Sequence, residues 1–155
     1  MTPATRLLKK QKISYKLHQY EHDASVRSYG EEAAQKMGVD EERVFKTLVV
    51  QGDGVMAVAV VPVDATLNLK SMAKAIGVKK VAMADPKDVE KTTGYILGGV
   101  SPLGQKRLLK TVINTSAFEY ETIFVSGGKR SLEIELSALE LQKLLRANTA
   151  DIAQK

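Results

Sequence analysis

The sequence contains no cysteine and no tryptophan, and its only imidazole groups belong to His18 and His22. Without cysteine the protein can form neither a disulfide nor a thiolate metal site, and it has no cysteine nucleophile. Gly-x-Ser-x-Gly, His-Glu-x-x-His and calcium-loop motifs are missing as well, which disfavours serine-triad, zinc-protease and calcium-binding functions. We therefore expect neither a bound metal nor a cofactor.

Long apolar runs are also absent from the sequence. No stretch approaches the roughly 18 consecutive apolar residues that a membrane-spanning helix needs, and the segment from Met1 to Arg6 lacks the apolar run of a secretory signal. A length of 155 residues is close to the commonest size of one folding unit. We expect a single domain over residues 1–155 that makes no membrane contact and remains in the cytoplasm.

The charged residues give a net charge of +5. An excess of cations favours a polyanionic partner, because pairing with phosphates releases counterions. The cations nevertheless come in short, separated groups that are also explained as solvated faces: Lys9-Lys10, Lys79-Lys80, Lys106-Arg107 with Lys110, and Lys129-Arg130. Aromatic residues make up only 5% of the chain, so we expect binding of one or two terminal nucleotides rather than a stacking platform for several bases.

Capping residues and hydrophobic periodicity predict the secondary structure. The predicted helices are 3–11, 31–37, 69–76, 86–93 and 138–146, and the predicted strands are 15–20, 44–50, 55–61, 80–83, 111–114, 122–125 and 132–136. A hairpin turn is expected at 51–54, irregular chain at 21–28 and 95–109, and a frayed tail beyond Asn148. The order of elements favours an α+β fold with a mixed central β-sheet, closed into a barrel and surrounded by helices.

Two glycine-bearing segments are candidates for chemistry. Residues 98–106 (GGVSPLGQK) contain three glycines and a proline, so bare backbone amides can approach an oxyanion or a phosphate closely. Ser126-Gly127-Gly128 lies between two predicted strands. Both patterns are also explained by tight turns. Neither has the spacing of a nucleotide-binding loop, which disfavours nucleoside triphosphate hydrolysis.

Two further positions carry polar groups that a ligand can use. Lys46 lies in the predicted strand 44–50, on the same face as apolar neighbours. If that face lines a pocket, the ammonium can neutralise a phosphate or carboxylate; on an edge strand, the same charge discourages aggregation. Tyr20 stands close to His22 and Asp23, where its hydroxyl can bind a ligand, although such a run is also typical of a capped turn.

Six short segments occur in a specific order: MTPA (1–4), YEHD (20–23), FKTLVV (45–50), TGY (93–95), GGVSPLGQK (98–106) and SGGKR (126–130). Together they resemble the YbaK family of free-standing tRNA-editing proteins, and most closely its cysteinyl-tRNA(Pro) deacylase branch. The resemblance spans nearly the whole chain. Two features depart from the family pattern, because the hairpin at 51–54 is shorter than usual and Ser131 stands where glycine is usual.

The resemblance implies a fold around a central β-barrel, with a pocket for the amino acid and the terminal adenosine of tRNA. It implies that Lys46 holds a phosphate of the acceptor end, and that Gly98, Gly99 and Ser101 bracket the scissile ester. Substrate contacts are implied for a further set, which comprises Tyr20, His22, Thr47, Pro102, Ser126, Gly127 and Gly128. A prolyl-tRNA synthetase is the implied partner.

An aminoacyl ester needs a nucleophile, and the sequence offers no cysteine and no recognisable serine–histidine pair. We therefore expect the thiol of the esterified cysteine to attack its own carbonyl, while loop amides stabilise the oxyanion. The predicted function is deacylation of misacylated Cys-tRNA(Pro). The alternatives are an alanine- or serine-clearing deacylase that uses a water in the pocket, and a module that binds aminoacyl-tRNA or a nucleotide without turnover.

Overall fold

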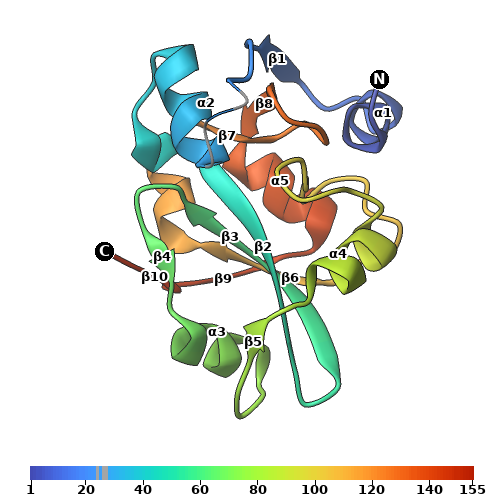
Figure 1. Cartoon of the computed structure of the whole chain (residues 1–155), viewed down its shortest axis with the longest axis vertical. Coiled ribbons are helices and arrows are strands. Elements are labelled where there is room, and N and C mark those ends of the chain that lie inside the picture. Colours follow the sequence, from blue (N-terminus) through green and yellow to red (C-terminus); the bar gives the residue numbers. More distant parts are fainter. Residues whose placement is uncertain (24, 26–27) are drawn as a thin grey trace.

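The computed structural model describes residues 1–23, 25 and 28–155 (Figure 1). The helices are α1 (Pro3–Lys10), α2 (Tyr29–Met37), α3 (Leu69–Ile76), α4 (Pro86–Thr93) and α5 (Ala138–Leu145), with short 3-10 turns η1 (Glu41–Arg43) and η2 (Thr115–Glu119). The strands are β1 (Tyr15–Gln19), β2 (Phe45–Gly52), β3 (Val55–Pro62), β4 (Thr66–Leu67), β5 (Ala82–Met83), β6 (Lys110–Asn114), β7 (Thr122–Ser126), β8 (Leu132–Ser137), β9 (Asn148–Ala150) and β10 (Ala153–Gln154). The predicted helices and strands are all present, some with shifted ends. Residues 24, 26 and 27 of the predicted irregular segment 21–28 lie outside the described residues.

The helix starts follow from their capping residues. Thr2 forms a capping box with Thr5 at the start of α1. Asn68 and Asp85 accept hydrogen bonds from backbone amides in the first turns of α3 and α4, and Ser137 does the same for α5. These side chains satisfy amides that a helix leaves unpaired, which is why the local sequence predicted the starts of these helices correctly.

β2 and β3 form a long antiparallel hairpin that runs through the molecule. Their register extends from Phe45 opposite Pro62 to Gly52 opposite Val55, with Asp53-Gly54 as the turn. Such two-residue turns match the twist of the flanking strands. Residues 57–62 of β3 are all buried, so this strand lies in the core.

The strands form three separate sheets, and the predicted barrel is wrong. A mixed sheet has the order β5-β2-β3-β6-β9, an antiparallel sheet has the order β1-β8-β7, and β10 pairs with β4. Within residues 1–23, 25 and 28–155, no sheet closes on itself, and Val44 and Phe124 form an isolated bridge between the two larger sheets. Barrel closure requires continuous pairing of edge strands. Residue patterns along single strands do not specify which edges pair, whereas the α+β class with a mixed sheet is confirmed.

The tail beyond Asn148 is not frayed, contrary to the sequence-based expectation. β9 adds to β6 as a parallel strand, and β10 pairs with β4. Between these strands, Ile152 is fully buried. The N–H groups of Ile152 and Ala153 donate to Oδ1 of buried Asn114 at 2.9 and 3.1 Å. The tail is therefore held by one internal asparagine as well as by strand pairing.

The arrangement in space separates the two ends of the β2–β3 hairpin. Figure 1 shows β1, β7, β8 and α2 around one end, and α3 and β5 near the other. The largest core cluster joins α1, β2, β6, β8 and α5 through residues that include Leu8, Phe45, Ile113, Ile134 and Leu141. A second cluster packs α3 against residues of β2 and β3. The first half of β2 is left next to α2 and the β7–β8 turn.

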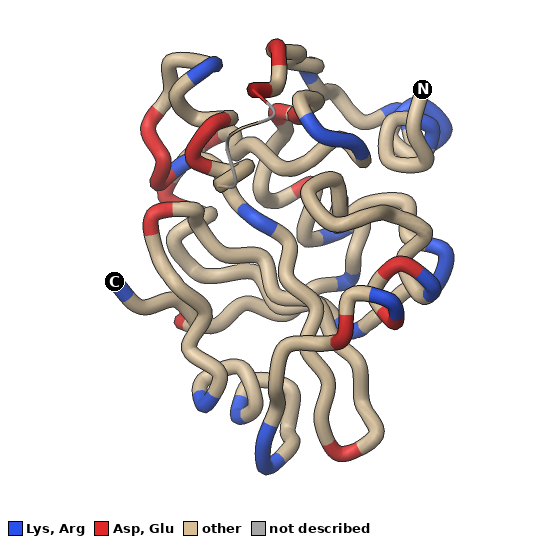
Figure 2. Tube along the Cα trace, viewed as in Figure 1, with Lys and Arg blue, Asp and Glu red and all other residues tan. Residues whose placement is uncertain are grey.

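The charged residues are spread over several parts of the surface. Figure 2 shows Lys and Arg at α1, near the β7–β8 turn and at the end that carries α3 and β5, whereas Asp and Glu gather around α2 and η1. The cations visible in this view therefore form separate groups. Among the residues that the structure describes, no helix combines the length and the apolar character needed to cross a membrane.

Candidate functional site

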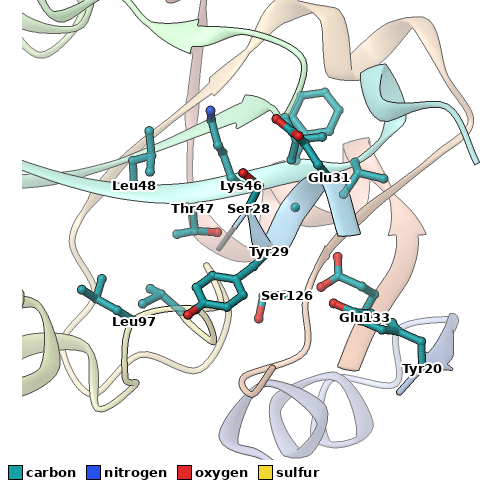
Figure 3. Close-up of a pocket in the computed structure, with 16 residues that line it drawn as sticks. Tyr20, Ser28, Tyr29, Glu31, Lys46, Thr47, Leu48, Leu97, Ser126 and Glu133 are labelled. Carbon is teal, nitrogen blue, oxygen red and sulfur yellow. The ribbon is translucent and has the colours of Figure 1, made fainter. Parts of the chain in front are cut away.

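A cavity of about 310 Å³ opens where α2, the first half of β2, the loop after α4 and the strands β7 and β8 meet (Figure 3). Cavities of this size can enclose a small organic group. The polar residues of the lining are Tyr20, Ser28, Tyr29, Glu31, Lys46, Thr47, Ser126 and Glu133. The cavity thus combines hydroxyl, carboxyl and ammonium groups in a small volume.

Lys46 contributes the ammonium group of the cavity. β5 pairs with β2 only at Val50 and Gln51, so within the described chain β2 is an edge at Lys46. Burial lowers the pKa of the Lys46 ammonium, and the carboxylates of Glu31 and Asp64 offset part of this shift. Lys46 therefore lies on a strand edge and also lines a pocket, so the structure is compatible with either role.

Thr47 presents a buried hydroxyl without a partner. No donor or acceptor among the described residues makes a hydrogen bond to its Oγ1. A buried polar group left in this state costs roughly 1–3 kcal/mol. Figure 3 shows Thr47 on the opposite side of β2 from Lys46, toward Tyr29. A ligand with a polar atom at this place would restore the missing hydrogen bond.

Glu133 is the most strongly perturbed acid of the cavity. The residue is only 8% exposed, and burial raises the pKa of its carboxyl to about 8. The carboxyl is therefore mostly protonated at pH 7 and in this form can donate a hydrogen bond. Glu133 lies opposite Ser126 in the β7–β8 ladder, so both side chains reach the cavity from one wall.

Tyr20 follows β1 and lines the cavity with Glu133. Its N–H donates to Ser131 O at 3.0 Å, which fixes its backbone to the β7–β8 turn. Burial, with Glu133 and Glu32 nearby, raises the pKa of the Tyr20 phenol to about 12. The hydroxyl therefore keeps its proton at neutral pH and can donate to a ligand.

His22 stands behind the cavity and is not among its lining residues in the described chain. Its Nδ1 lies 2.6 Å from one carboxylate oxygen of Glu32, and Asp23 N–H donates to the other at 2.8 Å. Burial alone would raise the pKa of Glu32, but these hydrogen bonds lower it overall. The pair joins the segment that carries Tyr20 to α2, whose first residue, Tyr29, lines the cavity.

The loop after α4 brings Gly98 to the cavity. Gly99 lies next to it with its N–H already donated to Ile96 O at 3.0 Å. A Cβ on Gly99 would stand 2.8 Å from Cα of Lys129, so this loop and the β7–β8 turn can approach only because position 99 is glycine. No acceptor for Gly98 N–H is found within the described residues.

Ser101 and Pro102 are buried within the same loop. Ser101 Oγ accepts a hydrogen bond from Leu103 N–H at 3.2 Å. Its carbonyl accepts another from the Gln105 side chain at 3.0 Å. Both bonds fix the shape of the loop, and Ser101 is not among the lining residues of the cavity in the described chain.

The β7–β8 turn forms the facing wall. Ser126 lines the cavity, and its Oγ accepts a hydrogen bond from Gly128 N–H at 3.2 Å. Gly127 N–H donates to Leu132 O at 2.8 Å, and its carbonyl accepts a hydrogen bond from the Thr2 hydroxyl. Gly127 and Gly128 therefore hold Ser126 in place and connect this wall to the start of α1.

Five of the site residues predicted from the sequence thus reach one cavity: Tyr20, Lys46, Thr47, Gly98 and Ser126. The others, His22, Gly99, Ser101, Pro102, Gly127 and Gly128, lie around it. Sequence reasoning missed Ser28, Tyr29, Glu31 and Glu133. Within residues 1–23, 25 and 28–155, no three His, Asp or Glu side chains are grouped so that they could hold a metal ion.

Comparison with known proteins assigns this chain to a family. A family model described as an aminoacyl-tRNA editing domain matches residues 23–144. The Enterococcus faecalis protein EbsC, named for deacylation of Cys-tRNA(Pro) and Cys-tRNA(Cys), is 40% identical over 99% of this chain and 94% of its own length. A proline–tRNA ligase of Thermosipho melanesiensis is 28% identical over 70% of this chain, which corresponds to 19% of the ligase. A solved structure described as a trans-editing enzyme for prolyl-tRNA synthetase has a TM-score of 0.84 and 25% identity, and the match covers 100% of this chain and 99% of that chain. As its resemblance to the YbaK family predicted, the chain belongs to the aminoacyl-tRNA editing domain family.

Proposed function

We propose that this protein is a deacylase that removes cysteine from misacylated tRNA(Pro). The observation that carries the proposal is the cavity of about 310 Å³, which is polar but contains no histidine or cysteine among its described lining residues. Such a cavity can bind and polarise an ester, yet it lacks the usual pair of nucleophile and general base. The 40% identity to EbsC over 99% of the chain supports cysteine as the amino acid.

The thiol of the substrate serves as the nucleophile. Its sulfur attacks the carbonyl carbon of the same aminoacyl group, an S–C bond forms, and the bond from that carbon to the ribose oxygen breaks. The thiol proton passes to the departing ribose oxygen, which leaves tRNA with a free hydroxyl and a cysteine thiolactone that water opens to cysteine. Well-oriented intramolecular reactions reach effective molarities of about 10⁵ to 10⁸ M, so the protein has mainly to fold and hold the amino acid.

The cavity residues stabilise the charge that develops on the carbonyl oxygen. Gly98 N–H and the Thr47 hydroxyl are two donors of cavity-lining residues for which no partner is found in the described chain, and donors of this kind act most strongly in a site that excludes water. Glu133 and Tyr20 keep their protons at neutral pH. They therefore contribute hydrogen bonds without placing a negative charge beside the oxyanion.

The remaining residues of the predicted set act at the edges of the cavity. Lys46 neutralises a backbone phosphate of the acceptor end, and Ser126 forms the wall opposite Gly98. The surrounding residues hold these groups in position through the hydrogen bonds and close contacts of the two loops and of α2: His22, Gly99, Ser101, Pro102, Gly127 and Gly128.

A required thiol also accounts for specificity. A pocket that selects by size gains only about 1–3 kcal/mol per methylene, which separates cysteine poorly from alanine or serine. Prolyl-tRNA synthetase is the proposed partner, acting in the cytoplasm, because segments of proline–tRNA ligases match this chain and the similar solved structure is described as editing in trans for that synthetase.

One assay tests the proposal against both alternatives. Cysteinyl-, alanyl- and seryl-tRNA(Pro) are incubated with the protein, and loss of the ester is compared with loss in buffer alone. The proposal predicts rapid loss for the cysteinyl ester only. Similar rates for all three esters would favour attack by a water in the pocket, and tight binding with no ester loss would favour a binding module.

A further inference from the structure

An arginine that lies over a tyrosine ring stands beside the cavity. The Arg130 guanidinium carbon lies 4.6 Å from the ring centroid of Tyr29, and Tyr29 lines the cavity. Arg130 Nη2 also donates to Leu97 O over a long distance of 3.5 Å. Three elements therefore meet at this point: the β7–β8 turn, the start of α2 and the loop after α4.

Gly98 makes this contact possible. Its φ is +89°, and an added Cβ would stand 2.7 Å from Arg130 Nε and 2.9 Å from Cε2 of Tyr29. A side chain at position 98 would therefore displace the arginine, the tyrosine or both. Gly98, which lines the cavity, thus also leaves room for the guanidinium and the tyrosine ring.

The guanidinium is held in place but keeps donors for a ligand. No carboxylate lies within 4.0 Å of Arg130 in the part of the chain that the structure describes. Apart from the bond to Leu97 O, no hydrogen bond from the Arg130 guanidinium is found among the described residues, and the fork of guanidinium N–H groups matches the oxygens of a phosphate. Because the contact with Tyr29 already restricts the side chain, less conformational entropy is lost when an anion binds.

The surroundings favour a nucleic-acid phosphate as that anion. Leu97 is 47% exposed and Ile96 is 61% exposed, so apolar surface lies beside the arginine and can contact a sugar or a base. The cavity itself is filled by the aminoacyl group under the proposed function. The RNA strand attached to the ester is the single-stranded acceptor end of the tRNA, which carries one phosphate per nucleotide.

We propose that Arg130, held by Tyr29 and Gly98, binds a backbone phosphate of the tRNA acceptor end beside the cavity, in addition to the phosphate assigned to Lys46. This inference rests on the proposed function, because that function supplies the acceptor end. It makes Arg130 a binding residue that contacts the RNA but not the scissile ester.

The first measurement uses binding alone, so that it does not depend on catalysis. The ligand is an uncharged RNA hairpin with the unpaired 3′ end of a tRNA acceptor stem, and its affinity is measured at several salt concentrations. Wild type, Arg130→Ala and Lys74→Ala are compared, because Lys74 belongs to α3 at the far end of the molecule (Figure 1). We expect Arg130→Ala to weaken binding roughly 10-fold and to reduce the slope of log affinity against log salt by about 0.7, with little change for Lys74→Ala.

The second measurement separates phosphate binding from support of the cavity. Arg130→Ala should lower kcat/KM for cysteinyl-tRNA but leave it unchanged for cysteinyl-adenosine, which has no phosphate. An unchanged affinity and salt slope, or an equal loss on both substrates, would overturn the inference. If wild type cleaves neither ester, the proposed function fails, and the hairpin titration still decides whether Arg130 binds a phosphate.

Discussion

Replacing Glu133 by glutamine exchanges a buried acid for a side chain of similar shape that never ionises. Glu133 is 8% exposed, and burial raises the pKa of its carboxyl from the usual 4.5 to about 8. In the unfolded chain this carboxyl loses its proton near its usual pKa, while the folded protein keeps it. Because the folded state binds more protons between these two pKa values, wild-type stability should fall as pH rises through this range.

The magnitude follows from the size of the pKa shift. One pKa unit corresponds to about 1.4 kcal/mol, and pH 7 lies roughly 2.5 units above the pKa of the unfolded carboxyl. Keeping Glu133 neutral at pH 7 therefore costs the folded protein about 3 kcal/mol relative to acid conditions. Glu133→Gln has no such cost, so its advantage in unfolding free energy over wild type should grow by about that amount as pH rises to 7.

The assay is urea unfolding of both proteins between about pH 5 and pH 8. Glu135→Gln is a control on the same strand, because the Thr122 hydroxyl and the His18 ring hold the pKa of the Glu135 carboxyl below its usual value. Stability contributed by Glu135 is fully present above the usual carboxyl pKa, so the difference in unfolding free energy between Glu135→Gln and wild type should stay constant over this pH range. Parallel curves for wild type and Glu133→Gln would refute the claim that this carboxyl is buried in its neutral form.

Three further substitutions test other parts of the account. Lys46→Ala should weaken binding of the RNA hairpin and lower its salt slope by about 0.7, as one phosphate contact is lost; unchanged binding and activity would remove Lys46 from the site. Ser131 has φ +67°, a backbone conformation that is strained for a residue with a side chain, so Ser131→Gly should raise the unfolding free energy by about 1 kcal/mol. The measurement is the melting temperature, which should rise; a lower melting temperature would contradict the claim that Ser131 is strained. Asn114→Ala leaves the amides of Ile152 and Ala153 without their acceptor and should lower the unfolding free energy by about 1–3 kcal/mol or more, with faster amide exchange in the tail; unchanged exchange there would count against the anchoring role.

The local elements of the fold could be predicted from the sequence because their causes are local. Thr2-Pro3, Asn68 and Asp85-Pro86 each stand where a helix begins, since a cap acts on amides within a few residues of itself. The β2–β3 hairpin was equally predictable, because Asp53-Gly54 joins two β-branched runs. Only β5 is clearly shorter than its predicted range 80–83.

The long-range features could not be predicted in the same way. Whether sheets close into a barrel depends on which edge strands pair, and a contact such as Val44 with Phe124 joins residues far apart in the sequence. The prediction of a frayed tail beyond Asn148 was wrong for a related reason. Its short polar strands look frayed by themselves, and their partners are β4, β6 and the side chain of Asn114.

The same distinction applies to the candidate site. Lys46 could be predicted as a site residue from the sequence, because a lysine among apolar residues of a strand is unusual. Glu133 gave no such signal, since Leu132, Ile134 and Leu136 alternate with it and assign it to the solvent side of β8. It is buried because Tyr20 and the cavity walls cover that side. Tyr29 was missed because α2 begins two residues before its predicted start.

The central claim is that the thiol of the bound cysteine, rather than a group of the protein, attacks the ester. The most direct measurement compares the deacylation rates of cysteinyl-tRNA(Pro) and S-methylcysteinyl-tRNA(Pro) with the same preparation of protein. The account predicts rapid loss of the cysteinyl ester and loss of the methylated ester at the rate seen in buffer. Cleavage of both esters at similar rates would contradict it and would assign the attack to a water or to a side chain of the cavity.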